Sequence, residues 1–355
     1  MHKVEKFFID KKAILEEAIH TIQRGGEGIA LVVDSDRRFI GTITDGDVRR
    51  AILNKMKLTT SVDHLLTHRP PNYLTPTTAS IGASTDELVR IMREKVIRQI
   101  PLIDTTGRVV RLALLSEFVV GDASLPLTAV VMAGGKGQRL QPLTEHLPKP
   151  MLPLHKQPLM ERTIEQLRDA GITKVHITTH YKSEVIVNHF GDGNSLGVAI
   201  NYITEKLPLG TAGALSLMEK PDKPFLVING DIVTQLDFRA LFDFHREHDA
   251  MMTVGVRIYE FQIPYGVVET NDVFITRLVE KPLQTFTVNA GIYLLSPDVH
   301  DYIPANTAFH MTDLIARLMK EGKRVVSFPI QEYWLDVGEH ADYKKANEDA
   351  KNGRL

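Results

Sequence analysis

Residues 128–144 read Thr-Ala-Val-Val-Met-Ala-Gly-Gly-Lys-Gly-Gln-Arg-Leu-Gln-Pro-Leu-Thr, the most informative segment for the architecture of the larger part of the chain. Its near-continuous apolar start, 128–133, is typical of a strand that is covered on both faces of a parallel sheet. The glycines that follow, Gly134, Gly135 and Gly137, allow the backbone to turn tightly and to approach a phosphate without an intervening Cβ. The stretch therefore predicts an α/β unit with an anion-binding turn after its first strand.

Two familiar glycine motifs do not fit this turn. A P-loop has Gly-Lys at the fifth and sixth positions after its first glycine, where this sequence has Arg139 and Leu140. A dinucleotide fingerprint that begins at Gly135 and Gly137 needs a third Gly or Ala where Leu140 stands. On the glycines alone, a structural turn without a ligand is the alternative interpretation.

Apolar runs alternate with helical patterns through the rest of this part of the chain. The apolar runs predict strands at 128–133, 174–179, 198–203, 224–229, 251–257, 288–295 and 324–328. The helical patterns predict helices at 158–170, 182–190, 211–219, 237–248, 312–321 and 339–351. This alternation favours the α/β class with a mostly parallel sheet.

The first third of the chain contains an internal repeat with an offset of 70 residues, in which Asp34 matches Asp104. Each copy reads as a helix, a short apolar strand, a turn, a second strand and a helix. Two unrelated αβ units that share a common pattern would be the alternative. A short polar, turn-forming stretch follows the second copy. We therefore expect a repeat domain at 1–121, a linker at 122–127 and a larger domain at 128–355.

Composition excludes several classes of protein. The chain has 355 residues, 42 Lys and Arg against 44 Asp and Glu, and no cysteine. The absence of cysteine excludes disulfides, thiolate metal sites and cysteine nucleophiles. The net charge of −2 argues against a nucleic-acid partner. No apolar stretch approaches the roughly 18 residues that a membrane span needs, and no signal peptide is evident, so we expect a cytoplasmic protein without a membrane partner.

The turn and the sequence after it resemble the sugar-1-phosphate nucleotidyltransferases, the nucleotide-sugar pyrophosphorylases. Gly-Gly-x-Gly-x-Arg-Leu-x-Pro-Leu-Thr, followed by Pro148-Lys149-Pro150, is close to their signature, except that Gln138 stands where relatives usually have Thr. Six more motifs follow in the family's order: Leu209-Gly210-Thr211-Ala212-Gly213-Ala214-Leu215, Asn229-Gly230-Asp231, Tyr265-Gly266-Val267-Val268, Glu280-Lys281-Pro282, Asn289-Ala290-Gly291-Ile292-Tyr293 and Trp334-Leu335-Asp336-Val337-Gly338. The resemblance implies a Rossmann-like domain with a mostly parallel mixed sheet.

The reaction of this family explains why charged residues are needed at these motifs. A sugar-1-phosphate oxygen attacks the α-phosphorus of a nucleoside triphosphate and expels pyrophosphate, and this nucleophile is already an anion. Catalysis therefore depends on aligning two polyanions and cancelling their repulsion, without a general base. The resemblance assigns Arg139 and Lys149 to the triphosphate and Lys281 to the sugar phosphate. It assigns Asp231 and Asp336 to Mg²⁺, which prefers few carboxylates together with phosphate oxygens.

The remaining family positions imply contacts with the two substrates. The resemblance places the nucleotide against Ala133, Gly134, Gly135, Gly137, Gly210 and Thr211, and the sugar against Gly266, Glu280 and Asn289. Each charged residue also has a structural alternative. Asp231 could end a strand as a turn or helix cap, Lys149 could be a solvated loop charge, and Glu280 with Lys281 could be a surface pair. Asp336 could cap the final helix.

The base is indicated by Glu205, which precedes Leu209 in a combination that resembles the guanylyltransferases. A carboxylate can accept hydrogen bonds from both N1–H and the 2-amino group of guanine, so GTP is favoured. The expected product is GDP-hexose or GDP-glucosamine for surface-glycan or nonulosonic-acid biosynthesis, with the sugar left open. A uridylyl- or thymidylyltransferase of the same family, or a nucleotide sensor without turnover, are the alternatives.

The repeat domain resembles a pair of CBS domains, through Gly41-Thr42-Ile43-Thr44-Asp45-Gly46-Asp47-Val48-Arg49-Arg50. The resemblance implies a possible adenine nucleotide, with Asp47 accepting hydrogen bonds from its ribose hydroxyls and Thr44 beside it. The second copy has Leu114 and Glu117 at these two places, which weakens its half-site. A dimerisation module without a ligand is the alternative, and we expect a homo-oligomer that forms through this pair.

Overall fold

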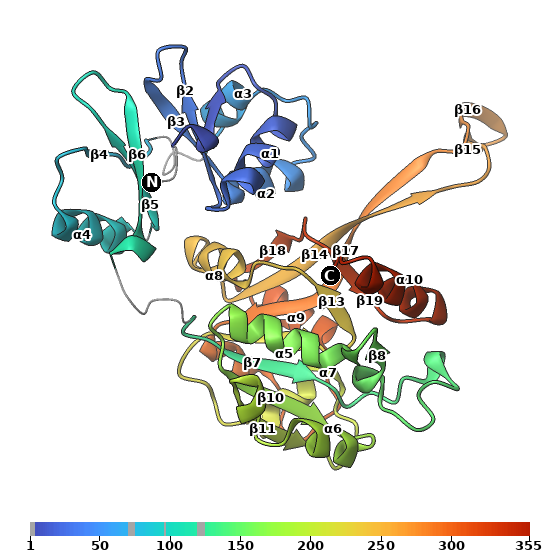
Figure 1. Ribbon diagram of the computed structural model, residues 1–355. Coiled ribbons are helices and arrows are strands. Elements are labelled where there is room, and N and C mark those ends of the chain that lie inside the picture. The colour runs from blue at the N-terminus through green and yellow to red at the C-terminus, as the bar shows by residue number, and fades with distance from the viewer. Residues whose placement is uncertain (1–3, 70–74, 96, 119–124) are drawn as a thin grey trace. The chain divides into compact units, whose positions relative to one another are not determined.

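The computed structural model describes residues 4–69, 75–95, 97–118 and 125–355, and the chain divides into two compact units, Met1–Ala123 and Ser124–Leu355 (Figure 1). The expected linker falls partly at 122–124, which lies outside the described residues. Leu125 and Leu127 are buried in the core of the second unit. That core therefore reaches three residues further toward the N-terminus than the first predicted strand.

The described residues of the first unit form two three-stranded sheets, of order β1-β2-β3 and β4-β5-β6. Its elements are η1 (Val4–Phe7), β1 (Phe8–Asp10), α1 (Leu15–Gly25), β2 (Ile29–Val33), β3 (Phe39–Thr44), α2 (Asp45–Leu53), α3 (Val62–Thr67), β4 (Ala79–Ser80), α4 (Thr85–Lys95), β5 (Gln99–Ile103), β6 (Val109–Leu114) and η3 (Leu115–Glu117), where η marks a 3-10 helix. One buried cluster joins the sheets and includes Leu31 of β2 and Leu112 of β6.

The offset of 70 residues reappears in the backbone of this unit. The Asp34 carboxylate accepts hydrogen bonds from the backbone N–H groups two and four residues later, and the Asp104 carboxylate does the same in the second copy. The two turns also pair reciprocally, because an N–H of each donates to a carbonyl of the other. The bridge between Arg38 and Arg108 lies at the centre of this pairing. The copies differ at their ends, where the first has α2 and the second has the short η3.

The second unit is built on a seven-stranded sheet of order β11-β10-β7-β12-β17-β14-β18. Across the sheet these strands are β11 (Ala199–Thr204), β10 (Lys174–Thr179), β7 (Thr128–Met132), β12 (Phe225–Asn229), β17 (Leu283–Leu295), β14 (Met252–Gln262) and β18 (Val325–Pro329). Four neighbouring pairs are parallel, and β17 alone runs against its two neighbours. The predicted α/β class with a mostly parallel mixed sheet is confirmed.

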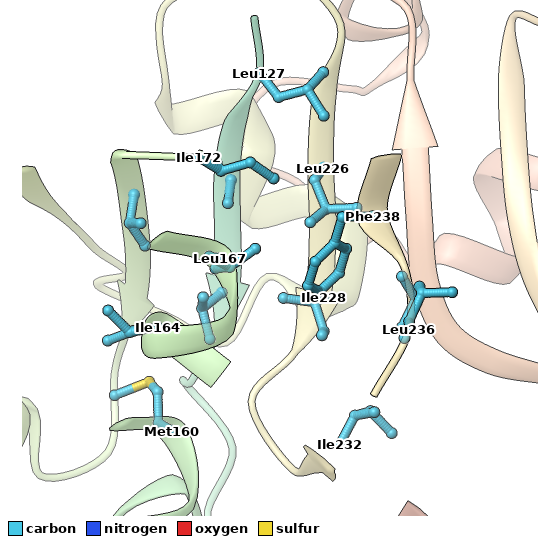
Figure 2. Close-up of a cluster of buried hydrophobic side chains, with 14 of the residues drawn as sticks. Leu127, Met160, Ile164, Leu167, Ile172, Leu226, Ile228, Ile232, Leu236 and Phe238 are labelled. Carbon is cyan, nitrogen blue, oxygen red and sulfur yellow. The ribbon is translucent and has the colours of Figure 1, made fainter. Parts of the chain in front are cut away.

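Helices cover the sheet and close its core. They are α5 (Leu159–Asp169), α6 (Ser183–Phe190), α7 (Gly210–Gly213), α8 (Phe238–Glu247), α9 (Met311–Lys320) and α10 (His340–Lys351). Figure 2 shows part of this core, where Phe238, the first residue of α8, lies beside Leu226 and Ile228 of β12, and Leu167 of α5 belongs to the same buried cluster. The helix predicted at 211–219 is in fact the single turn α7 followed by the 3-10 helix η7 (Ala214–Leu217). Among the described residues, no helix is both long and apolar enough to span a membrane.

Short elements around the sheet complete the unit. They are η4 (Gln138–Leu140), η5 (Lys149–Met151), β8 (Pro153–Leu154), β9 (Gln157–Pro158), η6 (Asn194–Leu196), β13 (Ile232–Thr234), β15 (Val267–Asn271), β16 (Phe274–Val279), η8 (Pro297–Tyr302) and β19 (Trp334–Asp336). Strands β14 and β17 continue well beyond the predicted 251–257 and 288–295. Their outer halves form a two-stranded ribbon that carries the hairpin β15–β16 at its end (Figure 1). We call residues 257–288 the arm.

A neutral histidine is buried between α8 and the sheet. His245 is 3% exposed, with Nδ1 2.8 Å from Thr253 Oγ1 and Nε2 3.1 Å from Ser296 Oγ. Ser296 donates its hydroxyl proton to the Ala250 carbonyl, so it accepts from Nε2–H, and Nδ1 accepts from Thr253. Burial lowers the pKa of His245 from 6.5 to about 4, although Asp249 opposes the shift.

Because His245 is buried in its neutral form, we expect the unfolding free energy of the second unit to fall in acid. Because the folded pKa lies below the unfolded one, the unfolded chain binds more protons between pH 6.5 and 4, and stability is lost as the pH falls through that window. We expect about 2 kcal/mol of the unfolding free energy to be lost between pH 7 and 5 through this group alone. Urea unfolding at both pH values, compared between the wild type and His245→Gln, measures it. Equal pH dependence in the two proteins would contradict the assignment.

Candidate active site

The charged cluster of the second unit lies at the edge of the sheet where the parallel strands β7 and β12 end. Asn229 of β12 pairs with Met132 of β7, so both strands finish at the same level. The glycine turn follows β7, and Gly230-Asp231 follows β12. Ligands in open α/β sheets bind at this edge. The topology therefore brings the predicted phosphate turn and the predicted metal ligand to one place.

Asp231 and Asp336 are brought together by the ladder between β13 and β19. Ile232 pairs with Asp336 in this ladder, and the Val337 N–H donates to the Asp231 carbonyl at 3.0 Å. The ladder explains why Asp336 is not a helix cap: α10 begins later, and its N-cap residue is Glu339. An aspartate from the middle of the unit and one from near its C-terminal end therefore come together.

Lys149 lies between these carboxylates. Its side chain, presented by η5, is largely buried, and Nζ is in contact with Asp231 Oδ2 and 3.9 Å from Asp336 Oδ1. Arg139 approaches from η4: a Cβ built on Gly338 would lie 3.7 Å from both Arg139 Nη1 and Asp336 Oδ1. The cluster thus has two cations and the two aspartates, with a third carboxylate at its edge, because Asp342 Oδ2 would lie 3.6 Å from the same Cβ. Lys149 is not the solvated loop charge that the sequence left open.

The two carboxylates have the character of a cation site. Burial raises the pKa of Asp336, the charge of Asp231 raises it further, and Lys149 and Arg139 lower it. Asp231 Oδ1 is buried without a hydrogen-bond partner, and so is Asn229 Oδ1. The described residues hold no group of three or more potential metal-ligating side chains. Two carboxylates fit a cation that takes its other ligands from phosphate and water, as Mg²⁺ does.

The glycine turn is packed so closely that one position requires glycine. Gly137 has φ +63°, and a Cβ there would lie 2.9 Å from Thr144 Cγ2 and 3.0 Å from Lys149 Cβ. Thr144 Oγ1 donates to the Gly137 carbonyl at 2.8 Å. Before the turn, the buried Ala133 donates its N–H to the Thr178 carbonyl, whereas a Cβ on Gly135 would meet no atom within 4 Å. The turn is therefore fixed from one side and open at Gly135.

Glu205 lies directly beside the start of this turn. It follows β11 and is 7% exposed, and its Oε1 would be 2.7 Å from a Cβ built on Gly134. Oε2 accepts the Leu209 N–H at 2.8 Å, and His180 Nδ1 lies 3.0 Å from the Glu205 carbonyl oxygen. Burial raises the pKa of this carboxyl, while its hydrogen bond from Leu209 and the nearby His180 lower it. One oxygen of this buried carboxylate is thus held by Leu209, and the other is turned toward the phosphate turn.

The Gly210-Thr211 motif has a packing role in this structure. Gly210 has φ +78°, and a Cβ there would lie 2.8 Å from the Phe309 carbonyl oxygen. Thr211 Oγ1 accepts the Met311 N–H at 2.9 Å, at the first residue of α9. These contacts seat the segment after Glu205 against α9. The nucleotide contacts expected of Gly210 and Thr211 stay predictions.

Three of the predicted sugar-phosphate residues lie on the arm instead of beside the aspartates. A Cβ on Gly266 would be 2.9 Å from Glu280 Oε2, and the Lys281 N–H donates to the Tyr265 carbonyl at 3.2 Å. All four residues are exposed. Lys281 has φ +45°, a left-handed conformation that costs an L-residue about 1 kcal/mol or more. In the described ranges, no ion pair links Glu280 or Lys281 to the cluster around Lys149.

The root of the arm connects these residues to the aspartates. Asn289 Oδ1 accepts the Gly291 N–H at 3.0 Å, and a Cβ on Gly291 would lie 2.7 Å from Asn229 Nδ2. On the other side, Trp334 Nε1 donates to the Ala290 carbonyl at 2.9 Å. The arm therefore leaves the sheet between the strand that precedes Asp231 and the strand that carries Asp336.

Sequence reasoning assigned no role to two residues of this site, Asn229 and His180. Asn229 belongs to the motif that contains Asp231, and its position two residues earlier gave no sign of its contact with the arm root. His180 directly follows the parallel strand β10, and residues just after such strands are favoured site positions. That position is the one signal that could have indicated His180.

In the first unit, Asp47 is engaged by neighbouring side chains. It is 6% exposed, and its Oδ2 accepts the Thr44 N–H at 2.8 Å and the Thr44 hydroxyl at 2.9 Å. Arg50 donates to Oδ1 at 2.7 Å, and Arg69 contacts Oδ2. A ribose would have to compete with these partners for the carboxylate. Glu117 of the second copy accepts from Arg111 at 2.7 Å.

Comparison with known families agrees with both units. Residues 128–353 match the family model described as nucleotidyl transferase. Residues 3–54 match the CBS domain model, which covers the first copy of the repeat.

Individual relatives resemble the larger unit. The mannose-1-phosphate guanyltransferase of Candida albicans is 36% identical over 227 residues, which are 61% of this chain and 62% of that protein. The protein of the same name from Saccharomyces cerevisiae is 34% identical over 228 residues, 61% of this chain and 63% of that protein. The chain thus spans less than two thirds of these relatives. A solved structure from Bacillus anthracis, provisionally named glucose-1-phosphate thymidylyltransferase, superposes with a TM-score of 0.52 at 25% identity over 64% of this chain and 96% of that one.

Proposed function

Since the chain belongs to the nucleotidyl transferase family, we propose that it transfers a nucleotidyl group, by preference from GTP, to a sugar-1-phosphate and releases pyrophosphate. The observation that carries this proposal is the cluster of Lys149, Asp231 and Asp336 beside the glycine turn. The expected product is a GDP-hexose or GDP-glucosamine that serves surface-glycan or nonulosonic-acid biosynthesis.

The residues at the sheet edge perform the positioning that this reaction needs. The open backbone at Gly135 receives the triphosphate, and Arg139 and Lys149 neutralise the charge that develops as pyrophosphate leaves. The sugar phosphate is already an anion, so its oxygen attacks the α-phosphorus without giving up a proton. Alignment of the two substrates adds to this electrostatic stabilisation.

Mg²⁺ is the proposed cofactor, held by Asp231 and Asp336. The unpartnered, buried Asp231 Oδ1 supports this assignment, as does the pKa of Asp336, which burial and then the charge of Asp231 raise. When bound, the ion would neutralise phosphate charge at the reacting centre. Lys149 would then lie next to both the ion and the phosphates.

Guanine is the proposed base, and Glu205 is the residue proposed to select it. Its carboxylate can accept from N1–H and the 2-amino group together, whereas uracil and thymine offer one such donor. Two relatives named as mannose-1-phosphate guanyltransferases support GTP. A uridylyl- or thymidylyltransferase is the second candidate, favoured by the structural neighbour named as a thymidylyltransferase. A sensor without turnover is disfavoured, because every cation and carboxylate of the cluster is present.

The sugar subsite is proposed to be formed by the arm and its root. Gly266, Glu280 and Asn289 would contact the sugar, and Lys281 its phosphate. The strained backbone of Lys281 and the packing of the arm root against Asn229 support a functional role for this segment.

The first unit is proposed to be a tandem CBS pair that regulates or dimerises the enzyme. The repeat of turn geometry at an offset of 70 residues supports the tandem arrangement. An adenine nucleotide on Asp47 and Thr44 stays part of this proposal. We also propose a cytoplasmic location, because the cytoplasm supplies nucleoside triphosphates.

Pyrophosphate release tests the function directly. The full chain is incubated with Mg²⁺, each of the four common nucleoside triphosphates and dTTP, and a set of sugar-1-phosphates. We expect release with GTP and at least one sugar-1-phosphate, with kcat/KM for GTP at least about tenfold above that for UTP or dTTP. Release with UTP but not GTP would overturn only the base assignment. No release with any pair would overturn the enzyme.

A further inference from the structure

His180 lies at the edge of the sheet where the parallel strands end, next to both the glycine turn and Glu205. It directly follows β10, which has β7 on one side and β11 on the other. A Cβ built on Gly134 would lie 3.4 Å from His180 Cβ and 2.7 Å from Glu205 Oε1. The two side chains therefore border the same point of the turn, although the imidazole has no part in the transfer step described above.

A backbone carbonyl fixes the tautomer of this histidine. His180 Nδ1 lies 3.0 Å from the Glu205 carbonyl oxygen. Because a carbonyl oxygen can only accept a hydrogen bond, Nδ1 carries the proton, and Nε2 of the neutral ring is a bare acceptor. The lone pair of Nε2 points away from that carbonyl, since the two nitrogens lie on opposite sides of Cε1. Among the described residues, none forms a hydrogen bond or an ion pair with Nε2.

Glu205 has one carboxylate oxygen engaged and one turned toward the turn. Oε2 accepts the Leu209 N–H at 2.8 Å, whereas Oε1 is the oxygen nearer the Cβ position of Gly134. A base with two adjacent N–H donors would therefore find one free carboxylate oxygen. A second acceptor beside Oε1 completes the match, and the bare Nε2 of His180 is an acceptor of this kind.

From these observations, we propose that His180 is a second base-selecting residue. Its Nε2 accepts a hydrogen bond from one of the two adjacent N–H donors of guanine, and Glu205 Oε1 accepts from the other. This inference rests on the proposed transfer from GTP and names the group that completes its base site.

Two neighbouring acceptors distinguish guanine from the other common bases. Guanine presents N1–H and the 2-amino group side by side. Adenine and cytosine place a ring-nitrogen lone pair next to their amino group, so one acceptor of the protein would face another acceptor. Uracil and thymine have a single N–H between two carbonyl oxygens. A site built from hydrogen-bonding groups rejects a ligand that leaves one of those groups unpaired.

The same ring could serve only to hold the Glu205 backbone through Nδ1, and two amide variants separate these roles. In His180→Asn, the short amide can take the place of Nδ1 and donate to the Glu205 carbonyl, but no group remains where Nε2 was. In His180→Gln, the longer amide can place its oxygen where Nε2 was, while the contact of Nδ1 is given up. The two roles therefore predict opposite results for this pair of variants.

Calorimetric titration of the full chain with GTP and UTP tests the inference, in the presence of Mg²⁺ and without a sugar-1-phosphate, so that binding alone is measured. We expect His180→Asn to raise the Kd for GTP at least about tenfold and to leave that for UTP within about threefold, which also reports a folded site. His180→Gln should keep the Kd for GTP within about threefold of the wild type. The matched control, His176→Asn, changes a part-exposed histidine in the middle of β10 and should alter neither constant.

Several results would overturn the inference. The reverse pattern, with GTP binding lost in His180→Gln and kept in His180→Asn, would show that the ring only holds Glu205. Loss in both variants or in neither would also contradict the role of Nε2, as would equal losses for GTP and UTP in His180→Asn. Failure of the proposed function is a different result: GTP binding without pyrophosphate release from any sugar-1-phosphate would overturn the transfer and leave the base site in place.

Discussion

Replacement of Asp231 by asparagine is expected to lower kcat by about a thousandfold or more, which corresponds to about 4 kcal/mol of transition-state stabilisation. Asparagine keeps the size of the side chain and an oxygen that can accept from Lys149. The substitution removes a negative charge that the proposed cation needs. The charge is lost from the carboxylate whose Oδ1 is buried and has no hydrogen-bond partner. The remaining ligand, Asp336, cannot hold the ion alone.

The loss should be catalytic and should leave the fold in place. Lys149 loses part of its ion pair, and we expect a destabilisation of about 1–2 kcal/mol, because Asp336 Oδ1 stays 3.9 Å from its ammonium. The matched control is Asp222→Asn, which changes an exposed aspartate of the same unit and should not alter kcat. Steady-state kinetics with thermal unfolding of the three proteins measures both effects. Near-normal turnover of Asp231→Asn would refute the metal assignment.

Glu205→Gln is expected to lower kcat/KM for GTP about a hundredfold, the second large effect. Guanine presents two N–H donors, and a glutamine whose oxygen keeps the hydrogen bond from the Leu209 N–H turns its own N–H donors toward them, which costs about 2–3 kcal/mol. The values for UTP and dTTP should change little or rise. The preference for GTP would therefore fall by about the same factor.

The thermal stability of Glu205→Gln should stay the same or rise, although its activity with GTP falls. Glu205 is buried, and burial raises its pKa, so a neutral amide relieves the cost of burying a charge. The amide oxygen can still accept the Leu209 N–H. We expect an unfolding temperature equal to or above that of the wild type. Glu219→Gln, at an exposed position, is the control for both measurements. An unchanged preference for GTP would show that another group selects the base.

The framework of the catalytic unit could be predicted from local patterns. The strand at 128–132, the glycine turn and the alternation that follows arise from the period of apolar side chains and from backbone freedom at Gly137. The predicted bounds of two strands were wrong at the ends that leave the buried core. The predicted strands 251–257 and 288–295 stop where their buried apolar runs stop. In the structure, the pairing of β14 with β17 continues beyond these runs along the arm. Apolar content marks burial, whereas strand pairing depends on the partner strand.

The order of the strands along the chain, the duplication in the first unit and the residue types available to the site all follow from local sequence patterns. Each of these depends on neighbours within a few residues or on an exact repeat. Tertiary structure alone decided which charges meet. Lys149 reaches Asp231 across 82 residues, Asp336 joins them through a strand ladder, and Glu205 comes to lie beside Gly134. It also decided that Lys281 lies on the arm, because the register of distant strands is set by packing of the whole sheet, which no local pattern records.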